Sequence, residues 1–149
     1  MIVIGLDSFQ GMPAITNQDN AQKCSPWVGS ENGKAIDVYT SYSMIAADTK
    51  NLKLLEGWFE DTIPANIHLF DNLDILRIDS DFYKSVKYCL ETLYDKVRPG
   101  GVIIFDDWHF NPDGVRTAAA EFLHKRDIKV NIIPHEQGRG PAYFVKPLK

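Results

Sequence analysis

Cysteine is scarce in this chain, with only Cys24 and Cys89 among 149 residues. Two cysteines without metal-ligand spacing exclude a disulfide scaffold and the usual kind of zinc site. We therefore expect a reducing compartment, with Cys89 as apolar filler in or near the core.

Long apolar runs and clusters of basic residues are also lacking. No hydrophobic stretch approaches the length of a membrane span, and residues 1–9 lack the basic region and cleavage signal of a secretory peptide. The net charge of −4, without any Lys/Arg cluster, argues against nucleic acid or an anionic membrane surface as the main partner. The sequence thus predicts a cytoplasmic protein that binds neither nucleic acid nor membrane.

The content of 44% hydrophobic residues is close to the globular average, so the chain can bury a core. Its length predicts a single domain over residues 1–149. Residues 14–42 are polar and weakly periodic, which predicts one long loop. Loops of this length are commonly lids or substrate-binding segments, and Trp27 within it is either a hydrophobic plug or a platform for substrate.

The strongest pattern is a pair of short apolar runs, Leu73–Ile78 and Val102–Phe105, which predict two strands. Between them, apolar residues recur at steps of four and three, as in a helix: Phe82, Val86, Leu90, Leu93 and Val97. We expect Ser80 or Asp81 to cap this helix and residues 99–101, Pro-Gly-Gly, to end it.

Acidic residues follow both strands: Asp79 and Asp81 after the first, Asp106 and Asp107 after the second. Strands joined by a helical crossover run parallel, so their carboxyl ends meet at one edge of the sheet, where open α/β sheets bind ligands. Carboxylates that converge repel one another unless a cation or a shared proton compensates, and Mg²⁺ suits such a set. For Asp81, a helix cap is an equally good explanation.

Weaker patterns predict the remaining elements. We expect strands at Ile2–Leu6, Leu52–Phe59, Lys129–Ile133 and Ala142–Val145, the last two forming an antiparallel hairpin, and helices at Ser43–Asn51 and from Pro112 onward.

Several motifs, in order along the chain, resemble the macrocin O-methyltransferase (TylF-like) family. They are DSFQGMP at residues 7–13, GWFEDTIP at 57–64, LRIDSDFY at 76–83, Gly100-Gly101 and Asp106-Asp107. The family consists of class I enzymes that use S-adenosylmethionine (SAM) and Mg²⁺ to methylate sugar hydroxyls of natural products. The resemblance implies an α/β, Rossmann-like methyltransferase fold, with a mostly parallel sheet and an antiparallel last strand, and a small-molecule hydroxyl acceptor as partner.

The resemblance also implies roles for the acidic strand ends. Asp79, Asp106 and Asp107 would hold the metal. A general base is still required, and Asp79 or His109 are the candidates within reach, although His109 lies outside the family motif. Ser80 replaces the glycine that is usual between the two aspartates.

The resemblance also implies a cofactor site, which residues earlier in the sequence would form. Asp7 would accept hydrogen bonds from the SAM ribose, with Ser8 beside it, and Gly57-Trp58 would border the adenine. In the family, a further strand and a glycine-rich SAM loop precede the motif with which this chain starts. The resemblance therefore implies either an N-terminally truncated part of a longer protein, which we favour, or a domain that closes its sheet differently, and we expect the chain as given to bind SAM weakly.

Two other functions compete with this one. Asp79-Ser80-Asp81 is an Asp-x-Asp triplet after a strand, which in a metal-dependent glycosyltransferase would hold Mg²⁺ or Mn²⁺ against a sugar nucleotide. The chain could also be a non-catalytic α/β fragment that serves in assembly. The sequence does not determine the oligomeric state, and a homo-oligomer is compatible with it.

Overall fold

The computed structural model describes residues 2–24, 38, 50–106, 108–109, 112–134 and 140–148. They fall into two compact units. Unit 1 holds the described residues up to Ala14 and from 38 to Ala65, and unit 2 holds Ile15–Cys24 and the described residues from Asn66 onward. The single domain over residues 1–149 stays a prediction.

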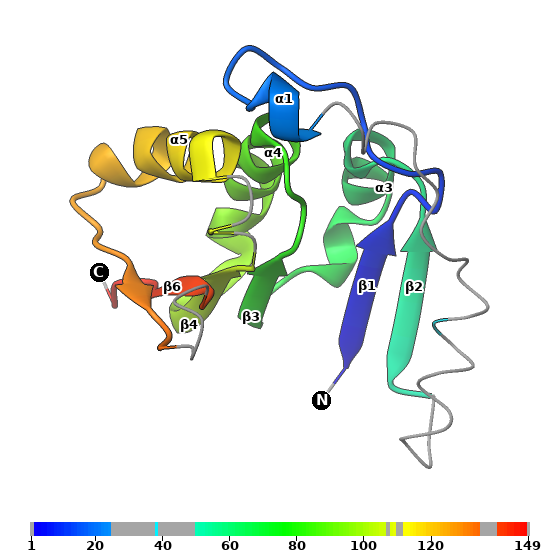
Figure 1. The fold of residues 1–149 in the computed structure, drawn as a ribbon. Helices are drawn as coiled ribbons and strands as arrows, with labels where there is room; N and C mark the ends of the chain where they lie inside the picture. Colours follow the sequence, from blue (N-terminus) through cyan, green and yellow to red (C-terminus); the bar gives the residue numbers. More distant parts are fainter. Residues whose placement is uncertain are drawn as a thin grey trace. The chain divides into compact units, whose positions relative to one another are not determined.

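The described residues of unit 1 include a two-stranded parallel sheet and the helix that follows it (Figure 1). Strand β1 (Val3–Asp7) pairs with β2 (Leu52–Glu56), with Asp7 opposite Glu56, and helix α3 (Phe59–Ala65) follows. The predicted extension of β2 to Phe59 is wrong. Gly57 ends the strand with a φ of +133°, and the Trp58 carbonyl then accepts the Thr62 amide at 2.9 Å, which starts α3. Most of the predicted helix Ser43–Asn51 lies outside the described residues.

Unit 2 contains a four-stranded sheet in the order β3-β4-β6-β5. The strands are β3 (Leu73–Ile78), β4 (Val97–Phe105), β5 (Asn131–Ile132) and β6 (Ala142–Val145). Strands β3 and β4 are parallel, whereas β6 runs antiparallel to both β4 and β5. The predicted parallel pair and the antiparallel last strand are therefore confirmed.

The described residues of unit 2 also form helices. They are α1 (Ala21–Cys24), α4 (Tyr83–Leu93) and α5 (Pro112–His124), with 3₁₀ turns at Ile67–Leu69 and Tyr94–Lys96. In Figure 1, α4 and α5 lie side by side. Burial alternates along the second half of β4, from Gly101 to Phe105, because successive residues of a strand point to opposite faces of the sheet. The largest fully buried side chains of the unit include Phe70, Phe82, Leu90, Ile103, Phe105 and Phe144. Within the part of the chain that is described, no helix is long and apolar enough to cross a membrane.

The predicted end of helix α4 at residues 99–101 is wrong, because these residues lie inside β4. The helix ends at Leu93, and Val97 is a strand residue rather than the last position of the helical stripe. Gly101 is required by close packing, since a Cβ there would lie 2.6 Å from Val97 Cγ1 and 2.9 Å from the Arg98 carbonyl oxygen. Gly100 has a φ of +76°, which favours glycine for a conformational reason, whereas Gly101 is required by crowding.

Helix α4 is capped from a distant segment. Its N-cap residue is Phe82, which has no side-chain cap bond, and Ser80 Oγ is buried without a hydrogen-bond partner, so the prediction of a cap from Ser80 is wrong. Asp19, which is 7% exposed, accepts the Tyr83 amide on Oδ1 at 2.8 Å. Part of the predicted loop 14–42 therefore packs on unit 2, whereas Trp27 lies outside the described residues.

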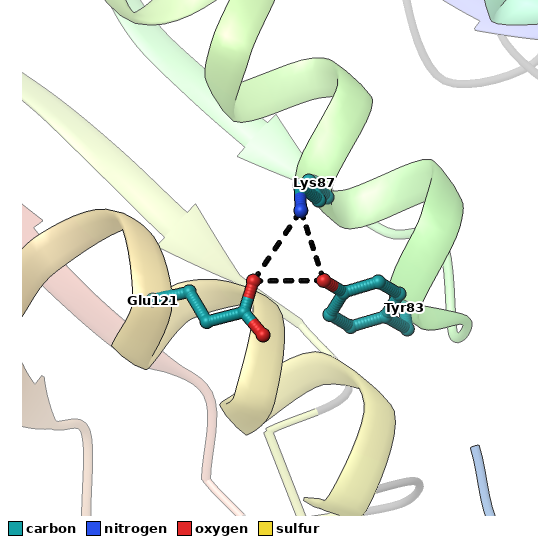
Figure 2. A network of polar contacts seen from close by, with 3 residues as sticks. All are labelled: Tyr83, Lys87 and Glu121. Atoms are coloured by element: carbon teal, nitrogen blue, oxygen red, sulfur yellow. Dashed lines mark hydrogen bonds and ion pairs between the residues drawn. The ribbon is translucent and has the colours of Figure 1, made fainter. Parts of the chain in front are cut away.

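A polar network joins α4 to α5 (Figure 2). The Tyr83 hydroxyl donates to Glu121 Oε2 at 2.7 Å, and Lys87 Nζ donates to the Tyr83 hydroxyl at 3.0 Å and lies 3.4 Å from Glu121 Oε2. The hydrogen bond from Tyr83 holds the pKa of Glu121 below its ordinary value, and the bond to the same hydroxyl raises the pKa of Lys87. One phenol thus links the two charges.

Replacing Tyr83 with Phe is expected to make stability depend less on pH at both extremes. The lowered pKa of Glu121 contributes stability above pH 4.5 that is lost as pH falls through the folded-state value. The raised pKa of Lys87 contributes stability below pH 10.5 that is lost as pH rises through its folded-state value. Urea denaturation from acid to alkali should show a wild-type advantage that is constant near neutrality and shrinks at both ends. Glu91→Gln, an exposed change on the same helix, is the control; an advantage independent of pH would contradict the linkage.

Candidate active site

Two acidic side chains meet at the carboxyl end of the β3-β4 pair in unit 2. Asp79 follows β3 and Asp106 follows β4. The parallel ladder continues one residue past β4, because the Asp106 amide donates to the Ile78 carbonyl at 3.0 Å. The strand register therefore brings together two of the predicted metal ligands, whereas Asp107 lies outside the described residues.

Arg77 lies between these two carboxylates. Its Nη2 is 2.9 Å from Asp79 Oδ2 and also 2.9 Å from Asp106 Oδ2, and its Nε donates to Asp106 Oδ1 at 3.3 Å. The sequence analysis predicted that converging carboxylates need a cation, but it did not identify the guanidinium of Arg77 as one. The signal was present, because residues two apart on a strand face the same side, which places Arg77 beside Asp79.

The carboxylates remain open to solvent. The side chain of Asp79 is 49% exposed and that of Asp106 is 35% exposed. Within the described ranges, no group of three or more His, Cys, Asp or Glu residues has the geometry of a metal site. The donor set that the structure brings together is thus two carboxylates, each of which can accept a further ligand.

The predicted base His109 has a fixed partner. Arg116 Nη2 lies 2.9 Å from His109 Nδ1, and Arg116 Nε donates to the Trp108 carbonyl at 2.9 Å. Because a guanidinium only donates hydrogen bonds, Nδ1 must accept, and the ring hydrogen then sits on Nε2. That Nε2 atom is buried and has no hydrogen-bond partner. This tautomer suits a donor better than a base, and the catalytic role of His109 stays a prediction.

In unit 1, the four predicted cofactor residues gather at the carboxyl end of β1 and β2. Asp7 ends β1, and the Gly57 amide donates to the Asp7 carbonyl at 2.9 Å. Asp7 Oδ1 accepts the Phe9 amide at 2.7 Å in a tight turn, and the exposed carboxylate is open to a ligand. Ser8 is buried and bonds within the turn to Gln10 and Gly11, so it shapes the loop.

Gly57 and Trp58 form the link to α3. A Cβ on Gly57 would lie 2.9 Å from Thr62 Cγ2, and its φ of +133° disfavours any other residue. The Trp58 carbonyl accepts the Asp61 and Thr62 amides, and its side chain is half-buried. Glycine is therefore required at residue 57 by both the packing against Thr62 and the backbone conformation, at the position predicted to border a nucleoside.

The model of the macrocin O-methyltransferase (TylF) family matches residues 2–138. The chain belongs to this family. Its members are O-methyltransferases that depend on SAM, so the predicted family is confirmed, and the glycosyltransferase alternative no longer has support.

The curated relatives are O-methyltransferases that are named for their substrates. The chain is 31% identical over 134 residues to mycinamicin III 3''-O-methyltransferase of Micromonospora griseorubida, covering 85% of this chain and 51% of that protein. It is 31% identical over 131 residues to demethyldecarbamoylnovobiocin O-methyltransferase of Streptomyces niveus, covering 85% and 49%. The chain thus spans about half the length of the curated relatives it matches.

Solved structures give the same fold. The O-methyltransferase NovP superposes with a TM-score of 0.76 at 28% identity, over 98% of this chain and 60% of that one. The calicheamicin methyltransferase CalS11 gives a TM-score of 0.77 at 20% identity, over 97% and 60%, which supports the fold alone. The predicted α/β methyltransferase fold is therefore confirmed, over part of the length of those proteins.

Proposed function

We propose that the protein transfers a methyl group from SAM to a sugar hydroxyl of a natural product, with the help of a divalent cation. The observation that carries the proposal is the family match over residues 2–138. It is supported by relatives named for methylation of mycinamicin III and of a rhamnosyl-tetracenomycin, the latter an enzyme of Streptomyces olivaceus at 29% identity over 78% of this chain and 44% of its own length.

The residues of unit 1 fit the nucleoside part of SAM. Asp7 presents an exposed carboxylate at the end of a parallel strand, and a carboxylate there can accept both ribose hydroxyls. Gly57 has no side chain, and the half-buried Trp58 next to it offers an apolar surface for the adenine. Ser8 would act indirectly, by holding the turn that follows Asp7.

The residues of unit 2 fit a divalent cation. Asp79 and Asp106 already direct one oxygen each at the same positively charged nitrogen of Arg77. Two carboxylates with solvent access suit Mg²⁺, which keeps several waters and binds substrate oxygens. In this proposal Asp107, which lies outside the described residues, would be the third ligand.

In the reaction, SAM would supply an activated methyl group, and the cation would lower the pKa of the acceptor hydroxyl. The residues of the chain would position the reactants and remove one proton from the acceptor hydroxyl. Asp79 would take that proton, because its carboxylate is exposed and accepts hydrogen bonds, whereas Nδ1 of His109 already accepts from Arg116 and Nε2 carries the ring hydrogen in the tautomer described above.

SAM binding tests the proposal directly. Calorimetry at high SAM concentration should detect weak binding, and Asp7→Ala should weaken it about tenfold, because a carboxylate that accepts two hydroxyls is lost. Asp61→Asn, an exposed change on α3 of the same unit, should leave the affinity unchanged. Mass spectrometry of sugar-bearing acceptors incubated with SAM should then show the added methyl group. Equal affinity for wild type and Asp7→Ala would remove the proposed cofactor site.

A further inference from the structure

Arg77 stands where the proposed cation would bind. A single nitrogen, Nη2, is 2.9 Å from an oxygen of Asp79 and 2.9 Å from an oxygen of Asp106. Nε adds a second contact to Asp106 at 3.3 Å. By contrast, Arg98 of the same sheet pairs with one carboxylate, that of Asp74 at 2.5 Å. The bridging position of Arg77 thus differs from an ordinary ion pair.

The position of Arg77 follows from the register of the sheet. Arg77 pairs with Ile104 and Ile78 with Phe105, so the next residues, Asp79 and Asp106, continue the two strands side by side. Arg77 and Asp79 face the same side because they are two residues apart. The hydrogen-bonded pair of strands therefore places the guanidinium next to both carboxylates.

We propose that Arg77 is a built-in counter-cation that competes with a divalent metal ion for Asp79 and Asp106, and that it leaves the carboxylates when the ion binds. This inference rests on the proposed cation site. A guanidinium carries one positive charge at every physiological pH, so it keeps the two carboxylates together in the metal-free protein. A divalent ion entering beside it would meet that charge at close range, which costs energy, and exchange removes the conflict.

The exchange has a consequence for selectivity. An ion that displaces Arg77 must interact with two carboxylates more strongly than the guanidinium does. A monovalent ion offers no gain in charge over Arg77, whereas a divalent ion doubles the charge at the site. The side chain of Arg77 is 55% exposed, so it can move into water without crossing the core. Arg77 therefore sets a threshold that favours divalent ions and lowers their apparent affinity.

The test is a titration of the full 149-residue chain with Mn²⁺, in which electron paramagnetic resonance measures the free ion. Arg77→Met removes the charge and keeps a long side chain, and it should bind Mn²⁺ about tenfold more tightly than wild type. Arg77→Lys keeps the charge but loses the planar fork, so it should fall between the two. Arg98→Met, which breaks the ion pair to Asp74, is the matched control and should bind like wild type. The difference between Arg77→Met and wild type should shrink as salt is raised.

The outcomes separate this inference from the function on which it rests. If wild type binds Mn²⁺ and both Arg77 variants bind equally well or more weakly, Arg77 does not compete, and the cation site still stands. If no variant binds Mn²⁺ at millimolar concentration, the cation site itself is wrong, and the role of Arg77 falls with it. Melting temperatures of all four proteins show whether each is folded, and Arg77→Lys keeps the test decisive if Arg77→Met does not fold.

Discussion

Replacing Asp19 with Ala is expected to destabilise unit 2 by about 3 kcal/mol, through three hydrogen bonds to a buried carboxylate. Oδ1 accepts the Tyr83 amide at 2.8 Å, and Oδ2 accepts both the amide and the hydroxyl of Thr16 at 2.8 Å. Removing the carboxylate leaves the first amide of α4 without its cap and the amide and hydroxyl of Thr16 without this acceptor, in a site where Asp19 is only 7% exposed. The effect exceeds that of an ordinary cap, because two elements lose their connection at once.

Urea denaturation, monitored with a spectroscopic probe located in unit 2, measures this loss of unfolding free energy. Asp19→Asn should be intermediate, because an amide oxygen can still accept one of the bonds. Asp113→Ala is the matched control: its exposed carboxylate accepts one hydrogen bond from a described residue, Asn20 at 3.2 Å, and its loss should cost less than about 0.5 kcal/mol. If Asp19→Ala were no more destabilising than Asp113→Ala, the carboxylate would not be the anchor that the geometry indicates.

The strand-helix-strand unit could be predicted from sequence because its signals are local. Strand β3 begins at Leu73 and ends at Ile78, as its apolar run predicts, and β6 covers Ala142–Val145 as predicted. Helix α5 starts at Pro112, where proline fits the first turn. The parallel direction of β3 and β4 follows from the crossover rule, so the meeting of Asp79 and Asp106 could also be predicted.

What the sequence did not reveal depends on distant or crowded contacts. The cap of α4 comes from Asp19, 64 residues earlier in the chain, and no local pattern signals it. The Pro-Gly-Gly stretch indicated a helix end, yet Gly101 serves close packing inside β4, which becomes visible only once Val97 and Arg98 have positions. Pro64 lies inside the short helix α3, although proline usually interrupts a helix.

The residues of the candidate site also divide into those that the sequence indicated and those that only the structure revealed. Residue type and strand ends pointed to the carboxylates, and family motifs pointed to Asp7 and Gly57. The pairing of His109 with Arg116 and the bridge made by Arg77 depend on side-chain directions that periodicity alone only suggests. These two arginines change the chemistry, because one fixes a tautomer and the other supplies a positive charge between the carboxylates.

Replacing Asp106 with Asn is expected to lower the catalytic efficiency of the proposed methyl transfer by about 100-fold, equivalent to about 2.7 kcal/mol of transition-state stabilisation. Asn keeps the shape of the side chain but removes one of the two negative charges that the structure brings together. With that charge gone, a divalent cation keeps Asp79 alone among the described ligands. The acceptor hydroxyl then loses the positive charge that would lower its pKa. Rates measured by mass spectrometry across Mg²⁺ concentrations should show both a lower maximum and a higher Mg²⁺ requirement.

Asp74→Asn provides the comparison for this prediction. Asp74 is an acidic residue of β3, its side chain is 72% exposed, and it forms a simple ion pair with Arg98. Its replacement should leave both the rate and the Mg²⁺ dependence unchanged, since it lies within the strand and not at its carboxyl end. Mg²⁺ should raise the melting temperature of wild type and of Asp74→Asn, but not that of Asp106→Asn, because only a ligand that binds the folded state stabilises it. Equal stabilisation of all three proteins would place the cation elsewhere, and the strand ends would then have to act through Arg77 alone.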